Sequence, residues 1–72
     1  MIIRSQDECA IYDTEKMSSI YTDTDGKVYI LGYTGEITYP IGDYANQERA
    51  KEVIEEIYAL IDSQTRFDMP VV

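Results

Sequence analysis

The sequence predicts an α+β fold, with a small antiparallel sheet of three to five strands followed by one amphipathic helix packed on one face of the sheet. Two patterns support this. Up to Ile41 the chain consists of short β-prone runs divided by turn residues, and from Gln47 to Asp62 apolar residues recur at helical spacing. We therefore expect one domain over residues 1–72, with strands at about 1–41, the helix at about 47–62 and a C-terminal tail at 63–72.

The first strands are expected to be short. Met1 to Arg4 opens with β-branched residues, and Cys9 to Tyr12 can form a second strand after a polar turn. A stronger strand begins at Met17, because the residues that follow include an isoleucine, a tyrosine and a threonine.

A β-hairpin is predicted at Asp25-Gly26, since Asp-Gly between alternating runs is a strong hairpin signal. The next strand, Lys27 to Tyr33, is apolar on both faces, with Tyr29, Leu31 and Tyr33 together on one of them. Strands of this kind are covered on both sides. One face should therefore meet the helix, and the other should meet a second copy of the chain, a loop or a ligand.

The last predicted strand, Glu36 to Ile41, should place Ile37, Tyr39 and Ile41 on one face. It contains Pro40, which has no N–H for a sheet ladder, so the strand should end there or lie at an edge.

The helix should begin after Asn46, which is a favourable N-cap residue. Its buried stripe is expected to contain Ala50, Val53, Ile54, Ile57, Leu60 and Ile61. The tail contains enough apolar residues to dock, either as an added edge strand or against a neighbouring subunit.

Composition limits how a chain of 72 residues can be stabilised. Folding buries only about 60% of the surface of so short a chain, and disulfides, metals or self-association usually compensate. The sequence has one cysteine and no histidine, which excludes an internal disulfide and a zinc site of the usual kind. We therefore expect a homo-oligomer without cofactor or metal.

The net charge of −8 makes nucleic acids and anionic membranes poor direct partners. No apolar run has the length of a signal-peptide core or a membrane span. We expect a cytoplasmic protein, in the host cytoplasm if the chain is phage-encoded, and the free cysteine agrees with this compartment.

The stretch YTDTDGKVY, from Tyr21 to Tyr29, has the spacing of part of an EF-hand calcium loop. With Gly26 as the loop glycine, Asp23 and Asp25 occupy the third and fifth positions, but the first position is Tyr21 and the twelfth is Gly32. Two essential ligands are missing, so the stretch is interpreted as a hairpin turn.

No catalytic constellation is evident. The chain lacks histidine, the commonest general base. Cys9 follows two acidic residues, which do not favour a thiolate, and we expect it to be a small buried hydrophobe. The prediction is that the protein is not an enzyme.

Seven tyrosines and few cations suggest a contact surface instead. Tyrosine is enriched at interfaces and can stack on nucleobases, although β propensity alone also places it in strands. Arginine can hold a phosphate. The candidate ligand or partner residues are Tyr21, Tyr29, Tyr33, Arg4 and Arg66. An alternative protein-binding face consists of Glu48, Glu52, Glu55 and Glu56 on the helix.

Three segments, MIIRSQD at 1–7, ERAKEVIEEIYALI at 48–61 and RFDMP at 66–70, resemble a family of short uncharacterised proteins of Gram-positive bacteria, their prophages and mobile elements. The segment DTEKMSSIYTDTDGK at 13–27 departs from the family pattern. The resemblance implies a sheet-plus-helix fold and a phage-type genomic setting. It transfers no site residue.

Together these observations lead to the hypothesis of a non-enzymatic phage- or mobile-element-type binding protein. It would form a homo-oligomer and sequester a small nucleotide-type signal, antagonising a host defence function. One alternative is an acidic protein-directed inhibitor that docks on a basic groove of a host enzyme, and another is a structural accessory protein. Arginines pooled at a subunit interface would favour the first hypothesis, and a uniformly negative surface the second.

Overall fold

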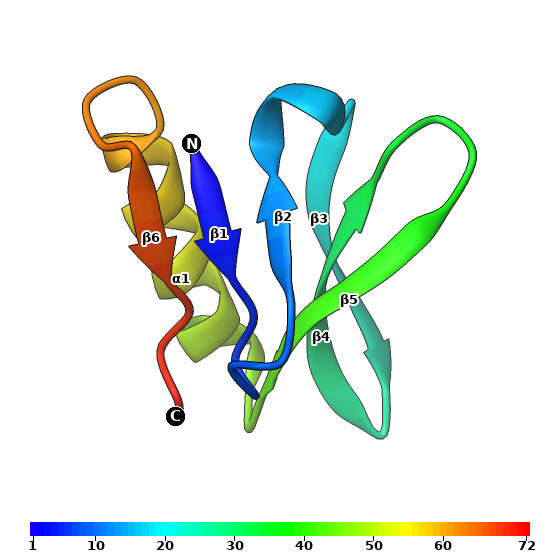
Figure 1. The fold of residues 1–72 in the computed structure, drawn as a ribbon. Coiled ribbons are helices and arrows are strands. Elements are labelled where there is room, and N and C mark those ends of the chain that lie inside the picture. The colour runs from blue at the N-terminus through cyan, green and yellow to red at the C-terminus, as the bar shows by residue number, and fades with distance from the viewer.

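A computed structural model describes residues 1–72 and confirms the α+β fold. Two three-stranded sheets and one helix make up the molecule (Figure 1). In chain order the elements are β1 (Ile2–Arg4), β2 (Ile11–Asp13), the short 3-10 helix η1 (Thr14–Lys16), β3 (Ser19–Asp25), β4 (Lys27–Tyr33), β5 (Thr38–Tyr44), α1 (Gln47–Leu60) and β6 (Arg66–Asp68).

The first sheet in the chain, which we call sheet A, has the strand order β2-β1-β6. β1 and β2 are antiparallel, whereas β6 joins β1 in parallel, with Ile3 opposite Phe67. Parallel neighbours require a long crossover, and here everything between β1 and β6 forms it. The tail therefore does add an edge strand, but to a second sheet that the sequence did not predict.

Sheet B is an antiparallel meander of order β3-β4-β5. The predicted turn at Asp25-Gly26 is confirmed, because Gly26 joins β3 to β4 with a φ of +77°, in the region that glycine adopts without strain. β4 coincides with the predicted strand from Lys27 to Tyr33.

A β-bulge changes the face pattern of β5. Ile30 pairs with Gly42 while Leu31 pairs with Pro40, so Ile41 is an extra residue. The strand does not end at Pro40 but continues to Tyr44, and it lies at the edge of sheet B, as a proline allows. After the bulge, Tyr44 faces the core and is 3% exposed.

Ile37 does not share a face with Tyr39 and Ile41 as predicted. It precedes β5 in the turn and is 52% exposed.

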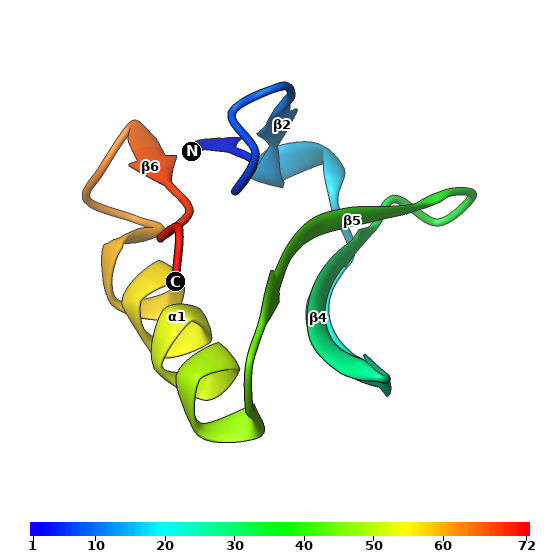
Figure 2. The ribbon, with the colours of Figure 1, turned by 90° about the horizontal axis from the view of Figure 1, so that it is seen from below.

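The core lies where sheet A, sheet B and α1 converge, and Figure 2 shows these three parts around it. Each contributes fully buried side chains, such as Ile3 from β1, Ile30 from β4 and Val53 from α1. Of the predicted helical stripe, Ala50, Val53 and Ile57 are buried, and Ile54 and Ile61 are partly buried against the core. The helix ends at Leu60, two residues before the predicted end. Asn46 caps the helix by accepting a hydrogen bond from the Arg49 N–H at 2.8 Å.

The 14 residues of α1 make it the longest helix, and no helix is long and apolar enough to cross a membrane.

Candidate functional site

The outer face of sheet A carries both predicted arginines. Arg4 and Arg66 lie there with Ile2, Ile11 and Asp68, and the five side chains line a cavity of about 540 Å³. We call this set the arginine face. It arises from strand pairing, because Ile2 lies opposite Arg66 and Arg4 lies opposite Asp68, so their side chains share one side of the sheet.

The two arginines differ in their partners. Arg4 Nη2 donates a hydrogen bond to Asp68 Oδ2 at 2.9 Å, and this contact raises the pKa of Arg4 above its ordinary value. The ion pairs of the molecule join Arg4 to Asp68, Lys27 to Asp43 and Arg49 to Glu52, so Arg66 has no carboxylate within ion-pair distance.

The three predicted tyrosines lie on the outer face of sheet B. Tyr29 and Tyr33 project from β4 on the side away from the buried Ile30, and Tyr21 joins them because it lies opposite Leu31. Tyr21 and Tyr33 are 39% and 38% exposed. We call Tyr21, Tyr29, Leu31 and Tyr33 the tyrosine face.

The sequence-predicted site is thus divided between two faces. The tyrosines gather on sheet B and the arginines on sheet A, and one chain does not bring the two groups together. Sequence reasoning missed Ile2, Ile11 and Asp68 as neighbours of the arginines. The alternation within IIR and within RFD could have indicated that Ile2 shares a face with Arg4, and Arg66 with Asp68. It could not have indicated that these two strands pair.

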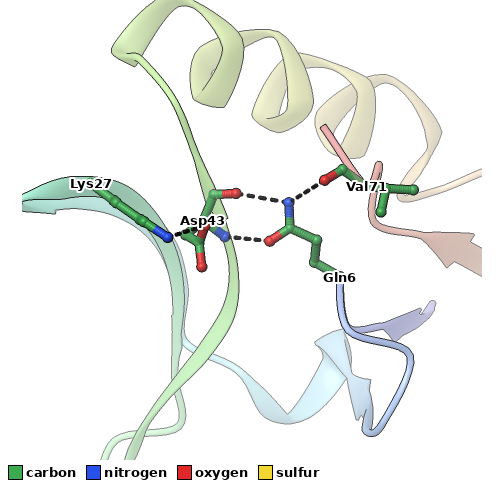
Figure 3. A network of polar contacts seen from close by, with 4 residues as sticks. All are labelled: Gln6, Lys27, Asp43 and Val71. Carbon is green, nitrogen blue, oxygen red and sulfur yellow. Dashed lines mark hydrogen bonds and ion pairs between the residues drawn. The ribbon is translucent and has the colours of Figure 1, made fainter.

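A bridge made by the Gln6 side chain joins the two sheets (Figure 3). Its Nε2 donates hydrogen bonds to the carbonyl oxygens of Asp43 at 2.7 Å and Val71 at 2.9 Å, and its Oε1 accepts one from the Asp43 N–H at 2.7 Å. The backbone N–H of Gln6 also donates to the Ile41 carbonyl at 3.0 Å. Gln6 therefore forms hydrogen bonds with the outer edge of β5 at the position where a neighbouring strand would otherwise pair.

The largest cavity, of about 860 Å³, lies beside this bridge at the start of α1. Its two cations are already engaged. Lys27 Nζ lies 3.8 Å from Asp43 Oδ1, and Arg49 contacts Glu52 at 3.8 Å and donates to the Val72 backbone oxygen at 2.9 Å. This cavity therefore has no unpaired cation to bind an anion, whereas the arginine face has Arg66.

Tyr44 connects β5 to the tail. Its hydroxyl donates a hydrogen bond to the Pro70 carbonyl at 2.9 Å, and burial raises the pKa of Tyr44 to about 12. The guanidinium carbon of Arg49 lies 6.0 Å from the centre of the Tyr44 ring.

The loop between β1 and β2 is ordered by its own polar groups. A hydrogen bond from Ser5 Oγ at 2.6 Å and another from the Cys9 N–H at 3.0 Å lower the pKa of Asp7. The prediction that Cys9 is buried is wrong. Cys9 is exposed, at a sharp turn where Glu8 has a φ of +64°.

The acidic residues do not form a metal cluster, since no group of three or more ligating side chains comes together. Asp23 and Asp25 lie on the exposed end of the β3–β4 hairpin. The predicted acidic helix face is exposed at all four positions, Glu48, Glu52, Glu55 and Glu56. Only Glu52 pairs with a cation, Arg49.

The segments that carry the family resemblance have clear structural roles. MIIRSQD contains the core residue Ile3 and the bridging Gln6, and RFDMP contains β6 and the buried Met69. These residues hold the two ends of the chain together. Comparison with protein-family models, with curated proteins and with solved structures finds no match to the chain.

Proposed function

We propose that this chain is a non-enzymatic binding protein that associates with itself and sequesters a small anionic ligand of the nucleotide type. One observation carries the proposal: Arg4 and Arg66 line a single cavity in a chain with fourteen acidic and six basic residues. The family resemblance implies only a phage-type genomic setting, and the role of antagonising a host defence function is our inference from that setting.

The chemistry of the arginine face suits a phosphate beside an apolar group. Arg66 has no carboxylate partner, so its guanidinium can take two phosphate oxygens in a bidentate contact. Asp68 orients Arg4 beside it. Ile2 and Ile11, which are 37% and 70% exposed, offer an apolar contact for a sugar or a base.

The tyrosine face of a second copy of the chain would complete the ligand site. It lies on the other sheet, so a small ligand at Arg66 meets the tyrosines of a neighbouring subunit and not those of its own. Tyr21 and Tyr33 are exposed enough to stack on a base there.

Native mass spectrometry of the protein as purified from cells is the first test. We expect a multimer that carries the added mass of a nucleotide. A titration with a panel of nucleotides and inorganic phosphate then separates base recognition from phosphate recognition. Arg66→Ala should weaken nucleotide binding by at least about tenfold, because a hydrogen bond to a charged group is worth about 1.5–3 kcal/mol.

Lys51→Ala is the matched control, because Lys51 is an exposed cation on α1 without an ion-pair partner. It should bind as the wild type does. Equal affinities for the Arg66→Ala and Lys51→Ala variants, or no binding of any nucleotide by the wild type, would refute the proposal.

A second candidate function is supported by the acidic helix face. Glu48, Glu55 and Glu56 are exposed without a cation partner, as an inhibitor that docks on a basic groove would require. Capture of a host protein from lysate that weakens steeply with salt and is lost in a Glu48→Lys, Glu55→Lys variant would support it. Binding that does not change with salt would reject it. A chain that binds neither ligand nor protein would leave the accessory role.

A further inference from the structure

An apolar groove runs between the second half of α1 and the start of β3. Its volume is about 260 Å³, and its apolar lining consists of Met17, Ile20, Ile54, Ile57, Tyr58 and Ile61. Ile57 forms the buried floor, whereas Tyr58 is 78% exposed. Tyr58 and the partly buried Ile20, Ile54 and Ile61 therefore form an apolar surface that a partner could cover.

The edge of sheet B adjoins this groove and is open. β3 is the outer strand of the order β3-β4-β5, and its seven residues form backbone hydrogen bonds to β4 alone. The opposite edge, along β5, is occupied by Gln6. An open edge strand is a template for pairing with another chain, and an apolar groove beside it can receive a side chain of the added strand.

We propose that the occupant of this edge and groove is a second copy of the chain. The two β3 strands pair antiparallel about a two-fold axis at Ile20, so that Ser18–Thr22 of each copy pair with each other. Directly opposite residues share a face and lie about 4.5–5.5 Å apart at Cβ. The two Ile20 side chains therefore meet on the helix side, where each groove receives apolar atoms from the other copy.

The charges of β3 select this register. Ser18–Thr22 is uncharged, whereas Asp23 and Asp25 occupy the far half of the strand. An axis at Thr22 would give a longer pairing but would bring four aspartates into the contact of two chains that each carry a charge of −8. An axis at Ile20 leaves these carboxylates beyond the paired segment.

The Ser18–Thr22 segment of the second copy also has the residues that suit the edge and the groove. Ser18–Thr22 is uncharged and β-prone and places one isoleucine on the helix side, where Ile20 already lines the groove. A chain whose buried core has only nine hydrophobic residues gains the most from such added burial. This inference rests on the proposed function only because both involve self-association of the chain. The proposed dimer leaves both the arginine face and the tyrosine face exposed.

Sedimentation of the full chain over a concentration series from micromolar upwards tests the contact. We expect a dimer, and Tyr58→Glu should raise its dissociation constant by at least about tenfold, because it places a charge in the apolar groove that the second copy covers. Ile37→Glu is the matched control, since Ile37 is an exposed isoleucine away from the edge. A monomeric wild type would overturn the proposal.

Cross-linking tests the register without requiring dissociation. In a Cys9→Ser background, Ile20→Cys should form an inter-chain disulfide under mild oxidation, because the axis places the two sulfurs opposite each other, and Thr22→Cys should not. Cross-linking through Thr22→Cys alone, or through neither position, would overturn the axis at Ile20. A dimer that binds no nucleotide would refute the proposed nucleotide binding and leave this inference standing. A nucleotide-binding monomer would overturn this inference together with the proposed self-association, and would leave the nucleotide binding standing.

Discussion

Replacing Gln6 with alanine is expected to loosen the junction between the two sheets. The Gln6 side chain makes three hydrogen bonds, two to Asp43 and one to Val71, and no other side chain connects the β1–β2 loop to both β5 and the tail. Gln6→Ala leaves the N–H and carbonyl of Asp43 without these partners at a partly buried site.

The expected loss follows from the number and burial of these bonds. The two contacts to Asp43 are partly buried, so each should contribute about 1 kcal/mol, while the exposed contact to Val71 should add little. We expect Gln6→Ala to lower the free energy of unfolding by about 2 kcal/mol. For a chain of this size, that corresponds to a fall in Tm of about 8–16 °C.

Urea denaturation followed by far-UV circular dichroism measures this loss at fixed protein concentration. Gln64→Ala is the matched control, because the exposed Gln64 side chain makes no hydrogen bond, and its free energy of unfolding should stay within about 0.5 kcal/mol of the wild type.

Gln6→Glu keeps the acceptor for the Asp43 N–H but loses the donor to both carbonyls, so at pH 7 it should be at least as destabilising as Gln6→Ala. Hydrogen exchange of the Asp43 amide should also become faster in the alanine variant. Equal stabilities of the Gln6→Ala and Gln64→Ala variants would refute the role assigned to the bridge.

Three further predictions concern the core, the tail and the helix. Ile30→Ala should cost about 3 kcal/mol because its side chain is fully buried, whereas Ile11→Ala, at 70% exposure, should change the free energy of unfolding by less than about 0.5 kcal/mol. Comparable urea midpoints for the two variants would contradict the assigned core. Tyr44→Phe should cost about 1 kcal/mol at pH 7, because the Pro70 carbonyl loses its donor. The raised pKa of Tyr44 means that the folded state favours the neutral phenol, so the advantage of the wild type is complete below pH 10 and should shrink as the pH rises towards about 12. A gap between wild type and Tyr44→Phe that stays constant from pH 9 to 11.5 would argue against this, in urea titrations at about 0.5-unit intervals. Asn46→Ala should cost about 1 kcal/mol through loss of the helix cap, with Asn46→Asp close to the wild type, and helical ellipticity during thermal melting would report both.

Local patterns were enough to predict several elements. The Asp25-Gly26 turn, the strand from Lys27 to Tyr33 and the cap at Asn46 depend on residues close together in the sequence. The two-sided apolar pattern of β4 led us to expect a second copy, a loop or a ligand over its outer face. Within one chain Tyr21 and Tyr33 on that face are 39% and 38% exposed, and what covers them stays a prediction.

Other features depend on contacts between distant segments. Whether Tyr44 or its neighbour faced the core depended on the bulge at Ile41, which shifts the alternation of β5 by one residue. Cys9 is small and apolar enough for a core, but the left-handed turn at Glu8 places it in solvent. Arg4 and Arg66 do lie on one face, but the tyrosines that were expected to share their site lie on the other sheet.

The sequence by itself determined the fold class, the hairpin, the helix with its buried stripe, and the excess of acid that leaves few cations for binding an anion. Local hydrogen bonding and side-chain periodicity act over a few residues, so they can be recognised without a structure. Only the tertiary structure decided that β6 pairs in parallel with β1, that Gln6 takes the place of a strand along β5, and that Arg4 and Arg66 meet on a face separate from the tyrosines. These outcomes depend on which distant segments pair and in what register, and a shift of one residue in register would turn each side chain to the opposite face.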